Sequence, residues 1–357
     1  MATLEQEITL TKEQAIELQE QSGNIRILEH INLSNMDKCS EQAPVYAFYV
    51  KGLQCTRDPR LAYHFWMNFG RNQFHLFTGQ DHNENINGAI YLFVPDLDEI
   101  EKSLASVRDE LQGTHFAFER INRGGATTRE LPREKWQLAL DLDAYDHIKA
   151  NDPYGSELRL LVTPRHYWSI YKSLGGMLPT DGVRDGVPQG MPFIVYPVRP
   201  GIAHGIARFF EYYLAAKTVV TKQSGANSEL FTTHVSCGPL QTIVFVEDAA
   251  QRENLGEYDG HHLCIHIDRF KECYDLAFNE KMNWNNLHFF DRCDTWFDAN
   301  RDQQYRILHI IDPVDKKFLL SFELEIRSAQ HFRNIVYRAD STPEQEAENE
   351  LKRQKHL

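Results

Sequence analysis

The sequence predicts an α+β protein with two domains. Its 357 residues allow two domains that each bury a sizeable core. Residues 28–33 alternate between apolar and polar side chains, which is typical of a strand. Residues 88–104 join a second strand to a helix: Pro95 closes the strand, Asp96 caps the helix, and Glu99 lies near its positive end. Mixed strands and helices of this kind predict the α+β class.

Composition narrows the possible partners and the compartment. The net charge of -13 and the lack of a basic stripe argue against a nucleic-acid partner. No apolar run approaches the ~20 residues of a membrane span, and the polar residues 1–22 fit neither a secretory signal nor a transit peptide. The six cysteines are scattered and form no CxxC pair. We therefore expect a soluble protein of the reducing cytoplasm, either a monomer or a homodimer.

The first half of the chain reads as an extension followed by two strand-rich segments. A polar helix is expected within residues 3–22 of an N-terminal extension, 1–24. The charged connection 129–149 is longer than a tight turn requires, which is typical of a lid or a contact surface. Glycine and aspartate residues then mark a linker at 165–190, with aromatic residues holding it in place. Further strands of this half are predicted at 65–69, 72–79, 114–119 and 158–162.

The second half repeats this order of elements. A strand at 193–198 leads into a helix at 203–214, and 241–247 forms the strand that closes this segment. The charged tail, 336–357, contains few apolar residues and is predicted to be a solvated helix or disordered. The last strands are predicted at 259–267, 305–311 and 318–326.

Five pieces of the first half together resemble a known superfamily. They are "EHINLSNMD", "FYVKGLQCTRDP", "NQFHLFTG", "GAIYLFVPDLDEI" and "DPYGSELRL", in this order. The chain is similar to the vicinal oxygen chelate superfamily, which includes glyoxalase I, bleomycin-resistance proteins and extradiol dioxygenases. The resemblance implies βαβββ modules that pair into a cup-like sheet, with metal ligands on the first and last strands of each module. It implies two tandem glyoxalase-like domains, 25–164 and 191–335.

The resemblance also assigns candidate ligands in the first half. The superfamily's ligand positions fall on His30, His75, Ala89 and Arg159. His30 and His75 are therefore predicted metal ligands, whereas arginine at the fourth position would repel a cation. A second interpretation needs no metal: the two histidines and Arg159 would bind a carboxylate or phosphate, which suits the planar guanidinium. A third leaves both histidines as hydrogen-bonded residues of a polar cup.

Fewer ligand positions are polar in the second half. Val195 and Ile243 are apolar, and the position of the superfamily glutamate falls near Leu320. His262 is the remaining candidate, and it would meet Glu323 if the last strand contains a bulge. Strand alternation places Cys264 and His266 on the same face as His262, but places Glu29 on the face opposite His30. Further candidate ligand-binding residues are Glu247, His266 and His309.

Two functional hypotheses follow from the resemblance. One is a metal-dependent lyase, isomerase or dioxygenase that acts on a small oxygenated molecule, with one divalent ion (Fe, Zn, Ni or Mn) held by His30, His75, His262 and Glu323. The other is a metal-free member that binds a small molecule or acts as a protein-contact surface. Catalytic residues are not identified. The sequence contains no phosphate loop and no dinucleotide fingerprint.

Overall fold

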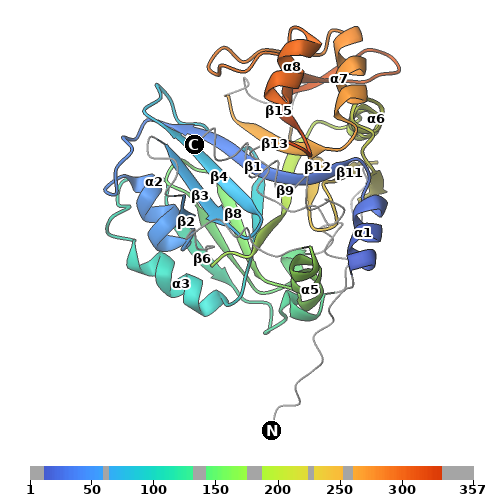
Figure 1. The fold of residues 1–357 in the computed structure, drawn as a ribbon. Coiled ribbons are helices and arrows are strands. Elements are labelled where there is room, and N and C mark those ends of the chain that lie inside the picture. Colours follow the sequence, from blue (N-terminus) through green and yellow to red (C-terminus); the bar gives the residue numbers. More distant parts are fainter. Residues whose placement is uncertain are drawn as a thin grey trace.

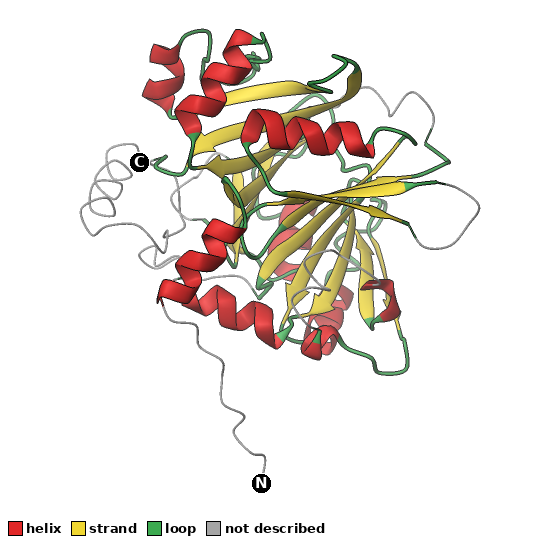
Figure 2. Ribbon diagram, turned by 90° about the vertical axis from the view of Figure 1, so that its right-hand side faces the viewer, coloured by secondary structure: helices red, strands yellow, loops and turns green. Residues whose placement is uncertain are grey.

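Two mixed β-sheets form the centre of the molecule. The computed structural model describes residues 12–58, 64–131, 142–174, 187–223, 229–251 and 260–331. The described strands form one sheet of seven strands and one of eight. Helices pack around these strands (Figure 1, Figure 2), with α7 and α8 grouped beside β15. This arrangement confirms the predicted α+β fold.

The first two modules follow the predicted order of elements, and in each the first strand pairs in parallel with the last. Such pairing needs a crossover connection, which the intervening helix provides. The first module contains β1 (Ile25–Asn35), α2 (Pro44–Tyr46), η1 (Ala47–Gly52), β2 (Thr56–Arg57), β3 (Phe65–Phe69) and β4 (Asn72–Thr78). The second contains β5 (Ala89–Val94), α3 (Leu97–Ser106), β6 (Ala117–Ile121), η2 (Thr128–Glu130), η3 (Leu142–Ala144), β7 (His147–Asn151) and β8 (Glu157–Val162).

The third and fourth modules repeat the plan, again with parallel first and last strands. The third contains β9 (Gly190–Val198), α6 (Ala203–Leu214), β10 (Thr218–Lys222), β11 (Phe231–Ser236) and β12 (Thr242–Glu247). The fourth contains β13 (His262–Ile267), α7 (Phe270–Asn279), α8 (Trp296–Asp302), β14 (Gln304–Ile311) and β15 (Phe318–Ser328). The predicted helix 203–214 is confirmed with the same bounds.

The modules do not pair in chain order. Antiparallel pairing of β1 with β13 joins the first module to the fourth, and pairing of β5 with β9 joins the second to the third. Each predicted half, 25–164 and 191–335, therefore contributes one module to each sheet. The local pattern of a strand identifies its buried face, but it does not encode which distant strand occupies its free edge. The domain boundaries themselves stay a prediction.

The two sheets share one apolar core. Ile31, Ile90, Ile194 and Ile265 come from the central strands of both sheets and belong to a single buried cluster. Burial of apolar side chains contributes about 25 cal/mol for each Å² removed from water, so this shared core is what holds the modules together. Each sheet has a second face, which does not contribute to this shared core.

The opposite face of the eight-stranded sheet is filled by apolar packing. Helix α5 (Arg165–Ser173) lies within the predicted linker and places Tyr167 against this face. The ring centroid of Tyr167 lies 4.9 Å from that of Phe93. Gly190 makes the approach possible, because a Cβ at this position (φ 153°) would lie 2.0 Å from the Tyr167 hydroxyl oxygen. This part of the predicted linker is thus a packed helix.

Other predictions fall partly outside the described residues. The N-terminal helix is present as α1 (Lys12–Gln21), and its Leu18 packs against the same apolar cluster as α5. Residues 132–141 of the long connection and the tail 336–357 lie outside the described residues. All six cysteines lie within the described residues and are free thiols. In the described part of the chain, no helix has the length and apolar character that crossing a membrane requires.

Candidate metal centre

The face of the seven-stranded sheet that lies away from the shared core carries polar side chains in two rows across four strands. Strands β4, β1, β13 and β15 are neighbours, and residues two apart along each strand point to the same side. The first row is His75, Asn32, His262 and Glu323, and the second is Gln73, His30, Cys264 and Glu325. The sheet therefore brings histidines from both ends of the chain into one place.

His30, His262 and Glu325 form one of two groups of possible metal ligands among the described residues, the other being Glu29, Cys264 and His266. In the first group, one donor atom from each residue lies within 4.8 Å of the others, and all three residues are buried. The Nε2 atom of His262 is 3.3 Å from Oε2 of Glu325, and the ring centroids of His30 and His262 are 6.2 Å apart. Two imidazoles and one carboxylate, contributed by three adjacent strands, are donors that Fe²⁺, Zn²⁺, Mn²⁺ and Ni²⁺ accept.

His75 lies beside this group. Its ring centroid is 6.0 Å from that of His30, and it stacks on Trp66 at 3.8 Å with nearly parallel planes. Its buried Nε2 atom has no hydrogen-bond partner. Burial and the neighbouring His30 and His262 hold the pKa of His75 well below its ordinary value. His75 is therefore a neutral base at the edge of the group, available to a ligand or a metal.

Glu323, the predicted carboxylate, is held by other partners. It accepts hydrogen bonds from Arg306 at 2.7 Å and from the side chain of Asn286 at 3.1 and 3.3 Å. Its Oε1 atom is 3.8 Å from Nδ1 of His262, so Glu325 lies closer to the histidines. No bulge interrupts the ladder between β13 and β15, because the parallel register already aligns Glu323 with His262. The bulge assumed from the sequence is not needed.

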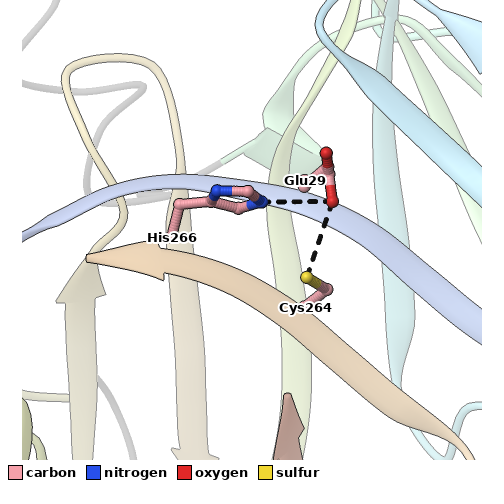
Figure 3. A group of neighbouring side chains, drawn as sticks. All are labelled: Glu29, Cys264 and His266. Atoms are coloured by element: carbon pink, nitrogen blue, oxygen red, sulfur yellow. Dashed lines mark hydrogen bonds and ion pairs between the residues drawn. The ribbon is translucent and has the colours of Figure 1, made fainter. Parts of the chain in front are cut away.

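Glu29 lies on the same side of the sheet as His30, so the sequence prediction for Glu29 was wrong. A register shift between Leu28 and His30 breaks the alternation of β1. Oε2 of Glu29 lies 3.2 Å from Nδ1 of His30, and Figure 3 shows the same carboxylate between His266 and Cys264. The distances from Oε2 are 3.1 Å to Nε2 of His266 and 3.6 Å to Sγ of Cys264.

Two buried arginines connect these carboxylates. Arg327 donates to Glu29 Oε2 at 2.7 Å and lies 2.6 Å from Oε1 of Glu325. Arg306 donates to Oε2 of Glu325 at 2.7 Å. A continuous chain of contacts thus runs from His30 through Glu29, Arg327 and Glu325 to His262. Interactions of this kind orient the side chains of a metal site and fix the tautomer of its histidines.

This chain of contacts sets the protonation states of Glu29, Glu325 and His30. Burial alone would raise the pKa of Glu29, but His266 and Arg327 hold it well below its ordinary value. Burial likewise opposes ionisation of Glu325, while Arg327 and Arg306 lower its pKa well below normal. Burial lowers the pKa of His30, partly offset by Glu29. The carboxylates are therefore ionised and His30 is neutral, which are the states that metal ligands need.

The charge of the cluster is compatible with a divalent cation. Four carboxylates, on Glu29, Asp291, Glu323 and Glu325, face the two guanidinium groups of Arg306 and Arg327. The formal charges of these four carboxylates and two guanidinium groups sum to two negative charges. Buried charge without a partner is costly, so a dication at His30, His262 and Glu325 would complete the balance. The residues present therefore fit such an ion.

A cavity gives small molecules access to these residues. Its volume is about 460 Å³, within the range of small-ligand pockets. Its walls combine aromatic rings with charged groups, so it suits a molecule with both an apolar body and oxygen atoms. The lining residues include the buried His30, His262 and Glu325 and the aromatic rings of Trp66, Phe289 and Phe290.

Other candidates from the sequence lie away from this cavity. Arg159 is on β8 in the eight-stranded sheet, where it contacts Glu157 and the Tyr91 hydroxyl. Glu247 accepts from the backbone N–H groups of Ala203 and Phe231, and so holds the start of α6. His309 is exposed on β14 beside Ser321.

The apolar residues at the predicted ligand positions also lie away from the cavity. Ala89 and Val195 pack in the apolar cluster of the eight-stranded sheet, and Ile243 belongs to the shared core. Leu320 is buried in that core too. These positions therefore form no ligand set with His30 and His75. His266 is near the site, but it contacts Glu29 and the Ser328 carbonyl, not the cavity.

Sequence reasoning missed Glu325, Arg306, Arg327 and Asn32. Glu323, Glu325 and Arg327 alternate along β15, so the sequence did signal a polar face on this strand. A role for these residues in the site depends on β15 lying next to β13 and close to β1, and no local sequence pattern predicts that strand order.

Comparisons with known proteins give structural neighbours only. No family model matches the sequence, and no curated protein matches it. Among solved structures, the chain is similar to a glyoxalase I mutant from Zea mays (11% identity, 89% of this chain and 97% of that chain, TM-score 0.49). It is also similar to a putative dioxygenase from Bacillus subtilis (12% identity, 94% and 97%, TM-score 0.45). Both likenesses are to solved structures at low identity, and membership of the superfamily stays a prediction from the sequence.

Proposed function

We propose that this protein is a metal-dependent enzyme that acts on a small oxygenated molecule, as a lyase, isomerase or dioxygenase. One observation carries the proposal: His30, His262 and Glu325 place two imidazoles and a carboxylate within 4.8 Å of one another, and all three line a cavity. A two-histidine, one-carboxylate set with open positions is typical of non-haem Fe(II) oxygenases, and this favours a dioxygenase among the three reactions.

The residues around the ligands have separate tasks. A bound divalent ion would polarise neighbouring oxygen atoms of a substrate. Glu29 orients His30, and Arg327 holds Glu29 and Glu325 at a fixed spacing. The neutral imidazole of His75 has a buried Nε2 atom without a hydrogen-bond partner, so it can accept a hydrogen bond from a bound hydroxyl group. Trp66 and Phe289 add apolar surface to the lining of the cavity.

A second function is favoured by the arginines. Arg306 and Arg327 contact both oxygens of Glu325, so this carboxylate is already neutralised by protein groups. A cup stabilised in this way folds without a metal ion and binds a small molecule through Trp66 and the histidines. Metal content separates the two functions, because the second requires none.

The test is metal analysis of purified protein by mass spectrometry after growth with Fe, Zn, Mn and Ni. We expect about one ion per chain, and loss of that ion in His30→Ala and His262→Ala. His309→Ala is the matched control, because His309 is an exposed histidine of the same sheet. Wild-type protein without metal, or an equal loss in the control, would overturn the enzyme proposal and leave the binding function.

A further inference from the structure

A second cavity lies in the same sheet, next to the first. Its volume is about 640 Å³. Phe289 lines both cavities, and its ring centroid lies 5.4 Å from that of His262 and 6.0 Å from that of Phe77. The ring of Phe289 therefore separates the two spaces while leaving them adjacent. We refer to the second space as the polar chamber, and its lining includes Asn32, Ser34, Asp81, His82, Glu84 and His288.

Asn32 is a residue of the polar chamber that lies beside the proposed ligands in the sheet. On β1 it lies between His75 of β4 and His262 of β13 in the sheet register. It is 2% exposed, and its Oδ1 atom has no hydrogen-bond partner. Leaving a buried acceptor unpaired costs about 1–3 kcal/mol. The terminal torsion of asparagine is broad, so a small rotation presents this oxygen to a molecule in the chamber.

The charge of the polar chamber is acidic. Asp81 and Glu84 line it, with His82 between them at 2.6 Å from Asp81 and 3.8 Å from Glu84, and none of its described lining residues is lysine or arginine. Glu84 is 3% exposed and is fixed by the backbone N–H of Ser34 at 2.6 Å. The first cavity differs, because Arg301, Arg306 and Arg327 line it beside its carboxylates. The polar chamber therefore favours a ligand that is cationic and donates hydrogen bonds, and it repels anions.

We propose that the polar chamber is a subsite for a positively charged arm of the substrate, carrying an ammonium group that donates to Asn32. This inference rests on the proposed function, because the arm belongs to the molecule whose oxygen atoms enter the first cavity. The substrate is thus an elongated molecule that passes Phe289, with its oxygenated end at His30 and His262 and its donor end at Asn32.

The experiment uses two small probes of matched size and opposite charge, ethanolammonium and glycolate. Both are titrated into ¹⁵N-labelled full-length protein, and NMR follows the side-chain amide of Asn32 and the indole N–H of Trp284, which lines the chamber. We expect ethanolammonium to shift both signals with a Kd on the order of millimolar, the range open to a ligand of so few atoms. Glycolate should leave them unchanged.

Two substitutions give this test its direction. Asn32→Leu removes the acceptor and should weaken ethanolammonium binding about tenfold, and Asn32→Asp adds a charge and should strengthen it several-fold. Asn300→Leu, an exposed position on α8, is the matched control. Asn32→Asp keeps the size of the side chain, so it serves if Asn32→Leu does not fold.

Three outcomes would overturn the subsite: no shift with ethanolammonium, equal binding of glycolate, or wild-type affinity in both Asn32 variants. Metal content is measured on the same samples. Ethanolammonium binding in a protein that takes up no metal would contradict the proposed function while supporting the chamber as a cation-binding site, so the two failures are distinguishable.

Discussion

The two sheets follow one plan of strands and differ in what covers their outer faces. On the seven-stranded sheet, the central strands β1, β13 and β15 carry histidines, glutamates and arginines beside two cavities. On the eight-stranded sheet, the corresponding strands β5, β9 and β8 carry apolar and aromatic side chains under α5. We call the outer face of the seven-stranded sheet the first cup and that of the eight-stranded sheet the second cup. The backbone does not decide which cup can carry chemistry; the side chains on that face do.

The difference shows that a face filled by packed side chains leaves no space for a substrate. Helix α5 brings Tyr167 and Tyr171 into the second cup, and this fills the space that a substrate would need. In the first cup, the only group of the 284–295 loop that lines both cavities is Phe289. The first cup keeps its polar groups in order through ion pairs, which are stable only as complete sets.

The substitution Glu325→Gln is expected to have the largest effect. It removes a proposed ligand and the counter-charge of Arg306 and Arg327 at once. Metal affinity should fall by at least about a hundredfold, and the free energy of unfolding by about 3–5 kcal/mol. Metal analysis and urea denaturation measure the two effects separately.

Glu157→Gln provides the control for this change in the other sheet. Glu157 pairs with Lys149 and Arg159 at a partly exposed site, so the expected loss of stability is below about 1 kcal/mol, with metal content unchanged. Equal losses in Glu325→Gln and Glu157→Gln would remove the distinction between the two cups.

Phe93→Ala tests the second cup as a structural core. Phe93 is fully buried between Tyr167 and Phe193. The cavity left by its removal should lower the free energy of unfolding by about 3–5 kcal/mol. Metal content per folded chain should not change, because no residue of the proposed ligand set touches this cluster. A loss of metal in folded Phe93→Ala protein would show that the second cup supports the first.

Glu29→Gln tests the order imposed on the ligands and should have a smaller effect. The amide keeps the size of the carboxylate but weakens the contacts with His30 and Arg327. Loss of such a supporting contact typically costs 10–100-fold in metal affinity, as a rough range. Cys264→Ser is the comparison. Cys264 lies 3.6 Å from the same oxygen of Glu29 and also contacts Glu325, and a serine hydroxyl keeps both contacts, so affinity should stay unchanged. If Cys264→Ser instead lowers metal stoichiometry, then Glu29, Cys264 and His266 would themselves hold an ion.

Local sequence patterns predicted the elements well because each depends on neighbours in the chain. Pro95 and Asp96 mark the boundary of β5 and α3, and Asp96 indeed accepts from the N–H groups of Asp98 and Glu99. The alternation of β13 correctly placed His262, Cys264 and His266 on one face. Capping and strand alternation depend on residues that are close together in the chain, so they can be predicted from the sequence.

The site itself depended on long-range pairing, and so it was predicted only in part. His30 and His262 were identified from the superfamily resemblance, but they were assigned to different cups. The pairing of β1 with β13 brings them together across more than 200 positions of the chain. Glu29 was missed because a bulge overrides alternation, and a bulge is fixed by the partner strand, not by the strand's own pattern.

The two cups should also differ in their response to acid. Burial lowers the pKa of His30 and holds that of His75 well below normal in the folded chain. The unfolded chain therefore binds protons first as the pH falls below about 6.5, and stability is lost from that pH downward, at about 1.4 kcal/mol per pH unit for each proton. The depressed pKa values of Glu29 and Glu325 add a further loss at lower pH.

Urea denaturation of chelator-treated protein between pH 7 and pH 4 measures this slope. His75→Gln removes one of the titrating groups, so its slope should be shallower than that of the wild type. Phe93→Ala should shift the whole curve downward without changing the slope, because that residue does not titrate. An unchanged slope in His75→Gln would mean that His75 is protonated alike in both states.

Arg159→Ala should have the smallest effect, and it tests the cup that is proposed to carry no chemistry. Arg159 is partly exposed, and it pairs with Glu157 while donating to the Tyr91 hydroxyl. Such a pair contributes no more than about 1 kcal/mol to stability. If Arg159 only stabilises the eight-stranded sheet, the variant keeps its metal and its affinity for ethanolammonium, and loses only this small part of its unfolding free energy. If the variant instead loses binding of a ligand, the second cup also holds a site, and the apolar packing of α5 would have to open to admit that ligand.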